Sequence, residues 1–344
     1  MDKKVIFAVA GSGKTTYIVN NLDYHKRFLI VTFTNNNYNN LQKKILEKFD
    51  GTWPGNITLL TYFQFLFQFC YKPFLSDKLK TRGIIYEKNP ERFIEQTNKQ
   101  YYMTSNGYLY SNRIALLIKK HVLNELKERL CKYFDCFIID EVQDIAGHDF
   151  NLLEELITAA IDILFVGDFF QHTFDTSQDG NVNKNLYKDM LKYKKRFESK
   201  GITVDTTTLT YSWRCSKNIC SFITKNLDIP IYSHRSSNDN TQIELIKDSN
   251  KAFSILNNEN IIKLHYQNSA KYGRGHKNWG DSKGEDHYID VCVLLNKTTK
   301  RAFNTKSIDT LAPATRNKLY VAITRAHGNV YFVDEALVVK KSNT

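Results

Sequence analysis

The sequence lacks the features that mark membrane, disulfide-stabilised and repetitive proteins. It has no uninterrupted run of 18 apolar residues, so no membrane-spanning helix is predicted. Its 6 cysteines include no CxxC pair, and the apolar run near Met1 is too short for a secretory signal. These absences favour a cytoplasmic protein with reduced core thiols over a disulfide scaffold or a cysteine metal cluster. No internal repeat, low-complexity segment or nuclease motif is evident.

The composition favours a globular protein with a polyanionic partner. A chain of 344 residues with 42% hydrophobic content is long enough for two domains with separate cores. The formal net charge is +12, from 48 basic and 36 acidic residues. Such an excess predicts a nucleic-acid partner more readily than an anionic membrane surface. On charge alone, the alternative is a merely soluble basic protein.

A phosphate-binding loop is predicted between an apolar run, Val5 to Val9, and a helix that begins at Lys14. A glycine-bearing loop between a strand and a helix directs several backbone N–H groups at one point, where the helix dipole also favours anions. In this pattern Lys14 reaches the β- and γ-phosphates, and the Thr15 hydroxyl holds Mg²⁺. The residues predicted to bind ATP here are Ala10, Gly11, Ser12, Gly13, Lys14, Thr15 and Thr16. The alternative is a Gly/Ser turn without a ligand.

Two acidic residues follow another apolar run, Cys136 to Ile139. A buried strand there presents Asp140 and Glu141 at its carboxyl end, where open α/β sheets bind ligands. We expect Asp140 to hold Mg²⁺ through its water shell, and Glu141 to act as the base on an attacking water. A further strand, Leu164 to Asp168, places Gln171 where it is expected to sense the γ-phosphate.

Other apolar runs predict the remaining elements of an α/β fold. In the first half, strands are expected at 28–33 and 57–61, helices at 38–49 and 185–197, and a small helical insertion at 70–133 with its most regular helix at 114–133. The pattern restarts near residue 205, with strands expected at 206–210, 243–246, 261–264, 291–295 and 330–333. A polar, glycine-dotted segment at 268–286 is typical of a functional loop. We therefore expect one domain over 1–204 and a second over 205–344.

The order of these signals resembles that of the UvrD/Rep-like superfamily 1 (SF1A) DNA helicases, in a compact form. The similar motifs lie, in chain order, at 10–15, 32–35, 61–63, 140–144, 166–171, 213–216, 282–285 and 319–326. The resemblance implies two RecA-like P-loop NTPase domains with mainly parallel sheets. It also implies that ATP and Mg²⁺ bind in the cleft between these domains.

The resemblance extends to residues outside the phosphate loop. It implies that Arg214 and Arg325 reach the γ-phosphate from the second domain and act in catalysis with Glu141 and Gln171. The remaining ATP-binding residues implied are Trp213, which would stack on the adenine, Gly284 and Glu285. The expected nucleic-acid contacts are Thr32, Thr34, Asn35, Thr61, Tyr62, Phe63, Phe174 and Ser282. Of these, Tyr62 and Phe63 are aromatic rings beside a strand end, which can stack on unpaired bases.

These signals support three hypotheses. The leading one is a DNA-dependent ATPase that translocates on single-stranded DNA or unwinds partly duplex DNA, with 3′→5′ polarity implied by the family alone. The second is a nucleotide-gated DNA-binding ATPase subunit, with a protein partner that supplies accessory domains or nuclease activity. The third is an RNA-dependent ATPase, since charge and stacking residues do not distinguish RNA from DNA.

Overall fold

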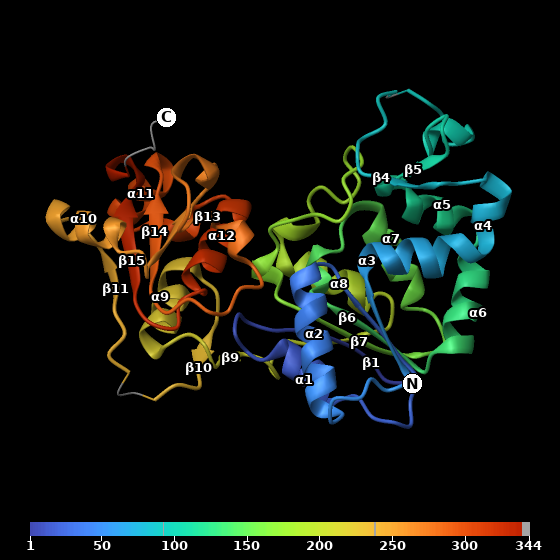
Figure 1. Ribbon diagram of the computed structural model, residues 1–344, viewed down its shortest axis with the longest axis horizontal. Helices are drawn as coiled ribbons and strands as arrows, with labels where there is room; N and C mark the ends of the chain where they lie inside the picture. Colours follow the sequence, from blue (N-terminus) through green and yellow to red (C-terminus); the bar gives the residue numbers. More distant parts are fainter. Residues whose placement is uncertain (92, 237–238, 339–344) are drawn as a thin grey trace. The chain divides into compact units, whose positions relative to one another are not determined.

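The computed structural model describes residues 1–91, 93–236 and 239–338. The chain divides into two compact units (Figure 1). Unit 1 comprises residues 1–7, 14–167 and 175–205, and unit 2 comprises residues 8–13, 168–174 and the described residues from 206 on. The segments 8–13 and 168–174 thus follow strands of unit 1 but have most of their contacts in unit 2. The domain boundary expected after residue 204 stays a prediction.

Unit 1 is built on a six-stranded, entirely parallel sheet in the order β3-β2-β6-β7-β1-β8. Its strands are β1 (Lys3–Phe7), β2 (Phe28–Thr32), β3 (Ile57–Thr61), β6 (Cys136–Asp140), β7 (Asp162–Gly167) and β8 (Thr203–Asp205). Every residue of β2 and β6 is buried, as expected of central parallel strands. Phe7 pairs with Gly167 and Asp140 with Val166, so the carboxyl ends of β1, β6 and β7 lie at one edge.

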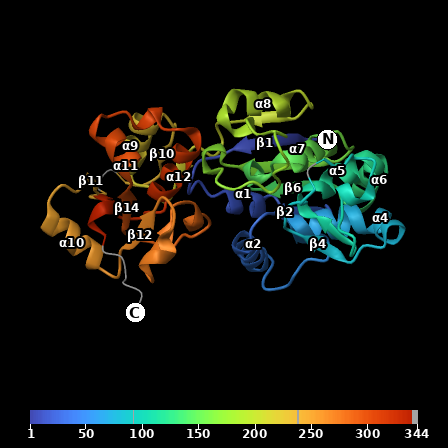
Figure 2. The ribbon, with the colours of Figure 1, turned by 90° about the horizontal axis from the view of Figure 1, so that it is seen from above.

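Helices cover both faces of this sheet. One face carries α1 (Lys14–Asn20) and α2 (Asn35–Lys48), and the other carries α7 (Gly147–Leu156) and α8 (Met190–Glu198) (Figure 2). The rings of Tyr193 and Phe197 in α8 pack against Phe7 of β1. Thr34 caps α2 by accepting the Asn37 N–H at 3.2 Å, so this helix begins three residues earlier than predicted.

The insertion between β3 and β6 contains helices and a small parallel sheet (Figure 1). Its elements are α3 (Tyr62–Gln64), a π-helix (Phe65–Tyr71), α4 (Lys72–Leu79), β4 (Gly83–Ile85), β5 (Tyr108–Tyr110), α5 (Ile114–His121) and α6 (Leu123–Tyr133). The single helix predicted over 114–133 is wrong. Two helices meet at Val122, because its backbone leaves the helical region at φ −145° and ψ 25°.

Unit 2 contains a five-stranded parallel sheet in the order β11-β15-β14-β12-β13. Its strands are β11 (Ile243–Leu245), β12 (Ile262–His265), β13 (His276–Asn278), β14 (Val291–Leu295) and β15 (Val330–Asp334). Its helices are α9 (Lys217–Leu227), α10 (Ser249–Asn257), α11 (Lys297–Asn304) and α12 (Pro313–Ile323). A separate parallel pair joins β9 (Tyr211–Ser212) to β10 (Tyr232–Ser233). Buried Trp279, Tyr320 and Phe332 lie in the unit 2 core.

The predicted α/β class with mainly parallel sheets is confirmed, and two details of the second half are wrong. Residues 206–210 form no strand, and Thr203–Asp205 forms β8 instead, paired with β1. The segment 268–286 is not only loop, because it contains β13, which pairs with β12. Among the described residues, no helix is both long and apolar enough to cross a membrane.

Candidate nucleotide and nucleic-acid site

A lysine, a glutamate and a glutamine meet at the carboxyl edge of the unit 1 sheet. Lys14 is the first residue of α1, and its Nζ lies 3.9 Å from Oε1 of Glu141, which directly follows β6. The Nε2 of Gln143 donates a hydrogen bond to Oε2 of Glu141 at 2.5 Å. Glu141 and Gln143 are 8% and 0% exposed. A buried carboxylate oriented in this way beside a phosphate-binding lysine is suited to act as a general base on water.

The backbone after β6 has an uncommon conformation. Glu141 has φ 60° and ψ 47°, in the left-handed region that non-glycine residues rarely adopt. Such a conformation persists where the surrounding structure fixes it. The Tyr193 hydroxyl donates to the Val142 carbonyl at 3.3 Å, and the Tyr187 hydroxyl donates to the Ile145 carbonyl. Two tyrosines therefore hold the loop that carries Glu141.

Gly167, the last residue of β7, allows this loop to approach the sheet. A Cβ atom at Gly167 would lie 2.3 Å from Oε1 of Gln143 and 2.9 Å from the side chain of Val142. Both distances are far below van der Waals contact, so any side chain at this position would displace the loop. The glycine is required by close packing.

The phosphate loop supplies groups that fit a triphosphate. Gly11 and Gly13 have φ values of 68° and 87°, which glycine adopts without steric cost. The Oγ of Ser12 is buried and has no hydrogen-bond partner among the described residues. An orphaned hydroxyl in such a loop fits a phosphate oxygen. Thr15 and Asp140, which are predicted to hold Mg²⁺, lie in the first turn of α1 and at the end of β6, and each has a side-chain oxygen that suits this ion.

Tyr320, which the sequence did not single out, links the phosphate loop to the loop after β7. Its side chain is fully buried in α12. Its hydroxyl donates to Oδ2 of Asp168 at 3.0 Å and accepts the Ala10 N–H at 2.9 Å. Asp168 also accepts the Phe170 N–H at 3.1 Å, in the one-turn helix that contains buried Gln171. Burial raises the pKa of Tyr320 well above its usual value, so this hydroxyl keeps its proton.

Both predicted catalytic arginines have partners within unit 2. Arg325 is 2% exposed, and its guanidinium donates to the carbonyls of Val321 at 3.2 Å and Glu285 at 3.1 Å. Arg214 forms an ion pair with Asp286. Partial desolvation of the exposed Asp286 carboxyl opposes its ionisation, but the Arg214 guanidinium holds its pKa below the usual value.

The amino-terminal half of the chain matches a known family. Residues 2–175, which are half of the chain, match the family described as the AAA domain. This chain belongs to the AAA domain family. Its AAA domain carries the phosphate loop, the acids after β6, and Gln171.

Solved structures similar to the whole chain include two of arterivirus nonstructural protein 10, a helicase. The complex of that protein with DNA has 16% identity and a TM-score of 0.52, and a crystal structure of the same protein has 14% identity and a TM-score of 0.51. Each covers 97% of this chain, which spans only 60% and 61% of theirs. At these identities the likeness shows the fold alone. A search of the curated proteins finds no match.

Trp213, beyond the AAA domain, belongs to an exposed group of four rings on the β9–β10 pair. It is 65% exposed, and its ring stacks on that of His234 with centroids 3.9 Å apart and planes 16° apart. The rings of Tyr211 and Tyr232 lie beside them, with centroids 5.2 Å apart. The backbone N–H of Trp213 donates to the Gly11 carbonyl at 2.9 Å, so this group of rings adjoins the phosphate loop. Stacked rings in this place are suited to hold a nucleobase.

Other residues predicted to bind ATP already have side-chain partners. The carboxylate of Glu285 pairs with Lys277, beside Gly284 with its φ of 83°. The hydroxyl of Thr16, in the first turn of α1, accepts a hydrogen bond from Lys44 at 2.8 Å. A nucleotide would have to compete with these contacts.

The AAA domain presents some of the predicted nucleic-acid residues and buries others. Asn35 is exposed in the first turn of α2, beside half-buried Thr34, and half-buried Thr61 ends β3. Thr32 and Tyr62 are 1% and 3% exposed. The nucleic-acid contacts predicted for these two residues stay predictions, and in this structure both side chains lie in the interior of unit 1.

In unit 2 the two residues predicted to contact nucleic acid also differ in exposure. Phe174 is 42% exposed and lies against Gly280. Ser282 is 0% exposed, and its hydroxyl donates to the Trp279 carbonyl at 2.7 Å. Ser282 therefore holds the local backbone in this structure, and the nucleic-acid contact predicted for it stays a prediction.

Phe63 lies in a row of rings that the sequence did not reveal. Its centroid is 6.5 Å from that of Phe33 and 5.1 Å from that of Tyr86. Tyr86 belongs to the insertion and is 66% exposed. The row runs from the end of β2 to the surface, so it provides aromatic area for unpaired bases. No local pattern around Tyr86 predicts this contact.

Proposed function

We propose that this chain is an ATP-hydrolysing motor of the UvrD/Rep-like superfamily 1 type, which acts on single-stranded or partly duplex DNA. The observation that carries the proposal is the buried group of Lys14, Glu141 and Gln143 beside the phosphate loop. The AAA domain family and the fold shared with arterivirus helicases support it. The helicase solved with DNA favours a nucleic-acid activator for this chain as well.

In the proposed reaction each unit 1 residue has one role. Lys14 binds the β- and γ-phosphates, while Thr15 and Asp140 hold Mg²⁺, which neutralises phosphate charge when bound. Glu141 accepts a proton from the attacking water. Gln143 keeps the Glu141 carboxylate oriented, through the hydrogen bond at 2.5 Å.

The two arginines complete the mechanism in this proposal. Arg214 and Arg325 stabilise the charge that develops on the γ-phosphate, a contribution worth about 10³–10⁵ in rate. Arg214 would have to exchange its ion pair with Asp286 for a phosphate. Hydrolysis would then depend on a conformational change, and that change would drive movement along the strand with 3′→5′ polarity.

The test is ATP hydrolysis measured with no strand, with single-stranded DNA and with RNA of the same length. DNA should accelerate turnover more than RNA does. Lys14→Ala should abolish turnover, and Glu141→Gln should retain bound nucleotide without hydrolysing it. Turnover that neither strand stimulates would refute the motor, and stronger stimulation by RNA would identify an RNA-dependent ATPase.

A second candidate is a nucleotide-gated binding subunit that hydrolyses ATP only with a protein partner. The observation that favours it is the engagement of Arg325, whose guanidinium is buried on two backbone carbonyls. Such a subunit would bind ATP and DNA but turn over slowly alone. Purification with a stoichiometric partner that restores turnover would support it, and rapid DNA-stimulated turnover by the isolated chain would exclude it.

A further inference from the structure

A groove on the insertion contains an apolar hollow. Leu79, Met103 and Leu117 line this part, which has a volume of about 380 Å³. Tyr102 lines it too, with a side chain that is only 5% exposed. An apolar hollow of this size can accept a flat ring.

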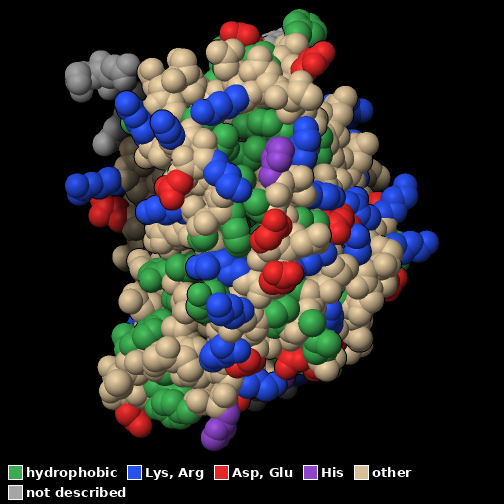
Figure 3. Space-filling model, turned by 90° about the vertical axis from the view of Figure 1, so that its right-hand side faces the viewer, with side chains coloured by type: hydrophobic (Ala, Val, Ile, Leu, Met, Phe, Trp, Pro, Cys, Tyr) green, Lys and Arg blue, Asp and Glu red, His purple; other side chains and the backbone are tan. Residues whose placement is uncertain are grey.

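Next to the hollow lies a basic part of about 520 Å³. Leu79, Lys99 and Met103 line both parts, so the two are neighbours. Lys80 and Arg82 lie at the basic end, are exposed, and form no ion pair within the described part of the chain. Figure 3 shows the side of unit 1 that carries the insertion, where Lys and Arg side chains lie around hydrophobic ones.

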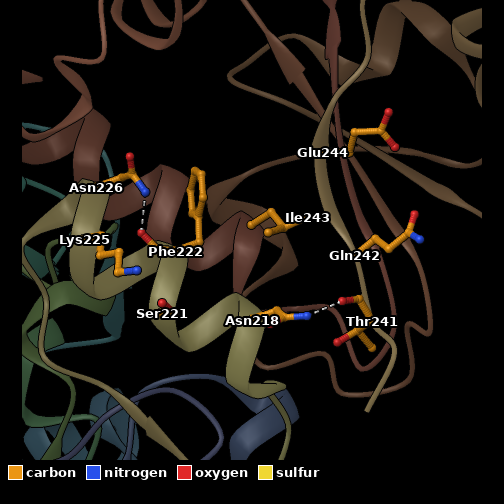
Figure 4. Close-up of a pocket in the computed structure, with 9 residues that line it drawn as sticks. All are labelled: Asn218, Ser221, Phe222, Lys225, Asn226, Thr241, Gln242, Ile243 and Glu244. Carbon is orange, nitrogen blue, oxygen red and sulfur yellow. Dashed lines mark hydrogen bonds between the residues drawn. The ribbon is translucent and has the colours of Figure 1, made fainter. Parts of the chain in front are cut away.

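The charge in this groove has one sign. Its charged lining residues are Lys80, Arg82, Lys99 and Lys120, and no Asp or Glu among the described residues lines it. The groove between α9 and β11 in unit 2 differs, because its lining includes both Lys225 and Glu244, which lie on opposite sides of it (Figure 4). A cationic rim around an apolar hollow is complementary to an anionic ligand with a flat apolar part.

We propose that the insertion groove binds one nucleotide of a single-stranded nucleic acid, with its base in the hollow and its phosphates at Lys80 and Arg82. The base packs against the apolar side chains of Leu79, Met103 and Leu117. This inference rests on the proposed action on a nucleic-acid strand and adds a second contact region to it. The groove thereby increases the length of strand that unit 1 holds.

The test measures binding of a fluorescein-labelled strand of about 15 nucleotides by anisotropy, without ATP and over a range of salt concentrations. Oligo-dT and oligo-rU are the two probes, which distinguish DNA from RNA. The groove variant is Lys80→Glu with Arg82→Glu. Its matched control is Lys43→Glu with Lys192→Glu, which makes the same change in net charge at side chains that are 77% and 83% exposed.

The groove variant should raise Kd about tenfold over the control and reduce the slope of log K against log salt by about 1.4, because two phosphate contacts are lost. Binding like that of the control variant overturns the proposal.

Two further outcomes separate this inference from the proposed function. If poly-glutamate of matched charge competes as well as the unlabelled strand, the groove is a general anion site and the nucleotide assignment is overturned. If Lys14→Ala turns over ATP normally while the groove variant still loses strand affinity, the proposed phosphate-binding role of Lys14 fails and the groove stands. If the wild-type chain hydrolyses ATP but binds neither probe, the groove fails alone.

Discussion

The stability of this protein should depend on pH through one buried carboxyl group. Asp149 lies in the first turn of α7 and is 1% exposed. Burial raises its pKa from 3.8 to about 7, and the hydroxyls of Thr176 and Tyr62 only partly oppose that rise. Asp149 therefore binds a proton more tightly in the folded protein than in the unfolded chain. The extra stability that the protonated Asp149 gives to the folded state is fully present below about pH 4, and it is lost as the pH rises through about 7.

The size of the effect follows from the shift. One pKa unit corresponds to about 1.4 kcal/mol, so a rise from 3.8 to about 7 amounts to roughly 4 kcal/mol. Between about pH 5 and about pH 8, where ordinary carboxyl groups stay ionised, the contribution of Asp149 to the free energy of unfolding should fall by about 2–3 kcal/mol. Burial lowers the pKa of His276 to about 4, which adds stability as the pH rises through the same range, so the difference between the wild-type and Asp149→Asn proteins isolates the contribution of Asp149. Asp149→Asn removes the titration and keeps the shape of the neutral side chain.

The assay is urea unfolding of the wild-type and Asp149→Asn proteins over this pH range. The variant should be the more stable protein, and its advantage should grow as the pH rises. Asp135→Asn is the control, because Arg27 holds the pKa of Asp135 at about 2 and nothing titrates there in this range. If wild-type and Asp149→Asn proteins lose stability in parallel, the burial of Asp149 does not govern this pH dependence.

Three other substitutions test the site. Gly167→Ala should lower the free energy of unfolding measured in urea by about 1–3 kcal/mol, because the loop after β6 must move. Gly55→Ala is the control and should change this free energy little, because its Cβ would have no atom within 4 Å. Equal losses of stability in the two variants would contradict the packing argument. Tyr320→Phe should raise the calorimetric Kd for Mg-ATP about tenfold, since the Ala10 N–H loses its acceptor; an unchanged Kd would rule out this role. Arg325→Ala should lower kcat for ATP by about 10³ or more while a folded circular dichroism spectrum is kept; a normal rate means that the arginine assignment is wrong.

The central strands could be predicted because local pattern and tertiary structure agree there. A strand buried on both faces needs a continuous apolar run, and β2, β6 and β14 have one. The threonine-rich segment 206–210 has strand propensity as well, but a strand forms only where a neighbour offers its backbone. The open edge beside β1 is occupied by Thr203–Asp205, although this segment ends in aspartate, a residue depleted in strands. Strand propensity therefore fails to predict a strand where pairing with a neighbouring strand decides which segment forms one.

The residues that the sequence missed are those whose roles arise from distant contacts. The glycines and Lys14 of the phosphate loop are predictable, because a triphosphate needs them wherever the loop occurs. The Ala10 N–H of the same loop also needs a partner when it is buried, and Tyr320 supplies one from 310 positions away. Nothing near either residue in the chain encodes that pairing. The loop residues that would contact a nucleotide can therefore be predicted locally, whereas the residue that holds the loop backbone depends on tertiary contacts. Substitutions at Tyr320 should affect nucleotide binding through the backbone of the loop and not through contact with the nucleotide.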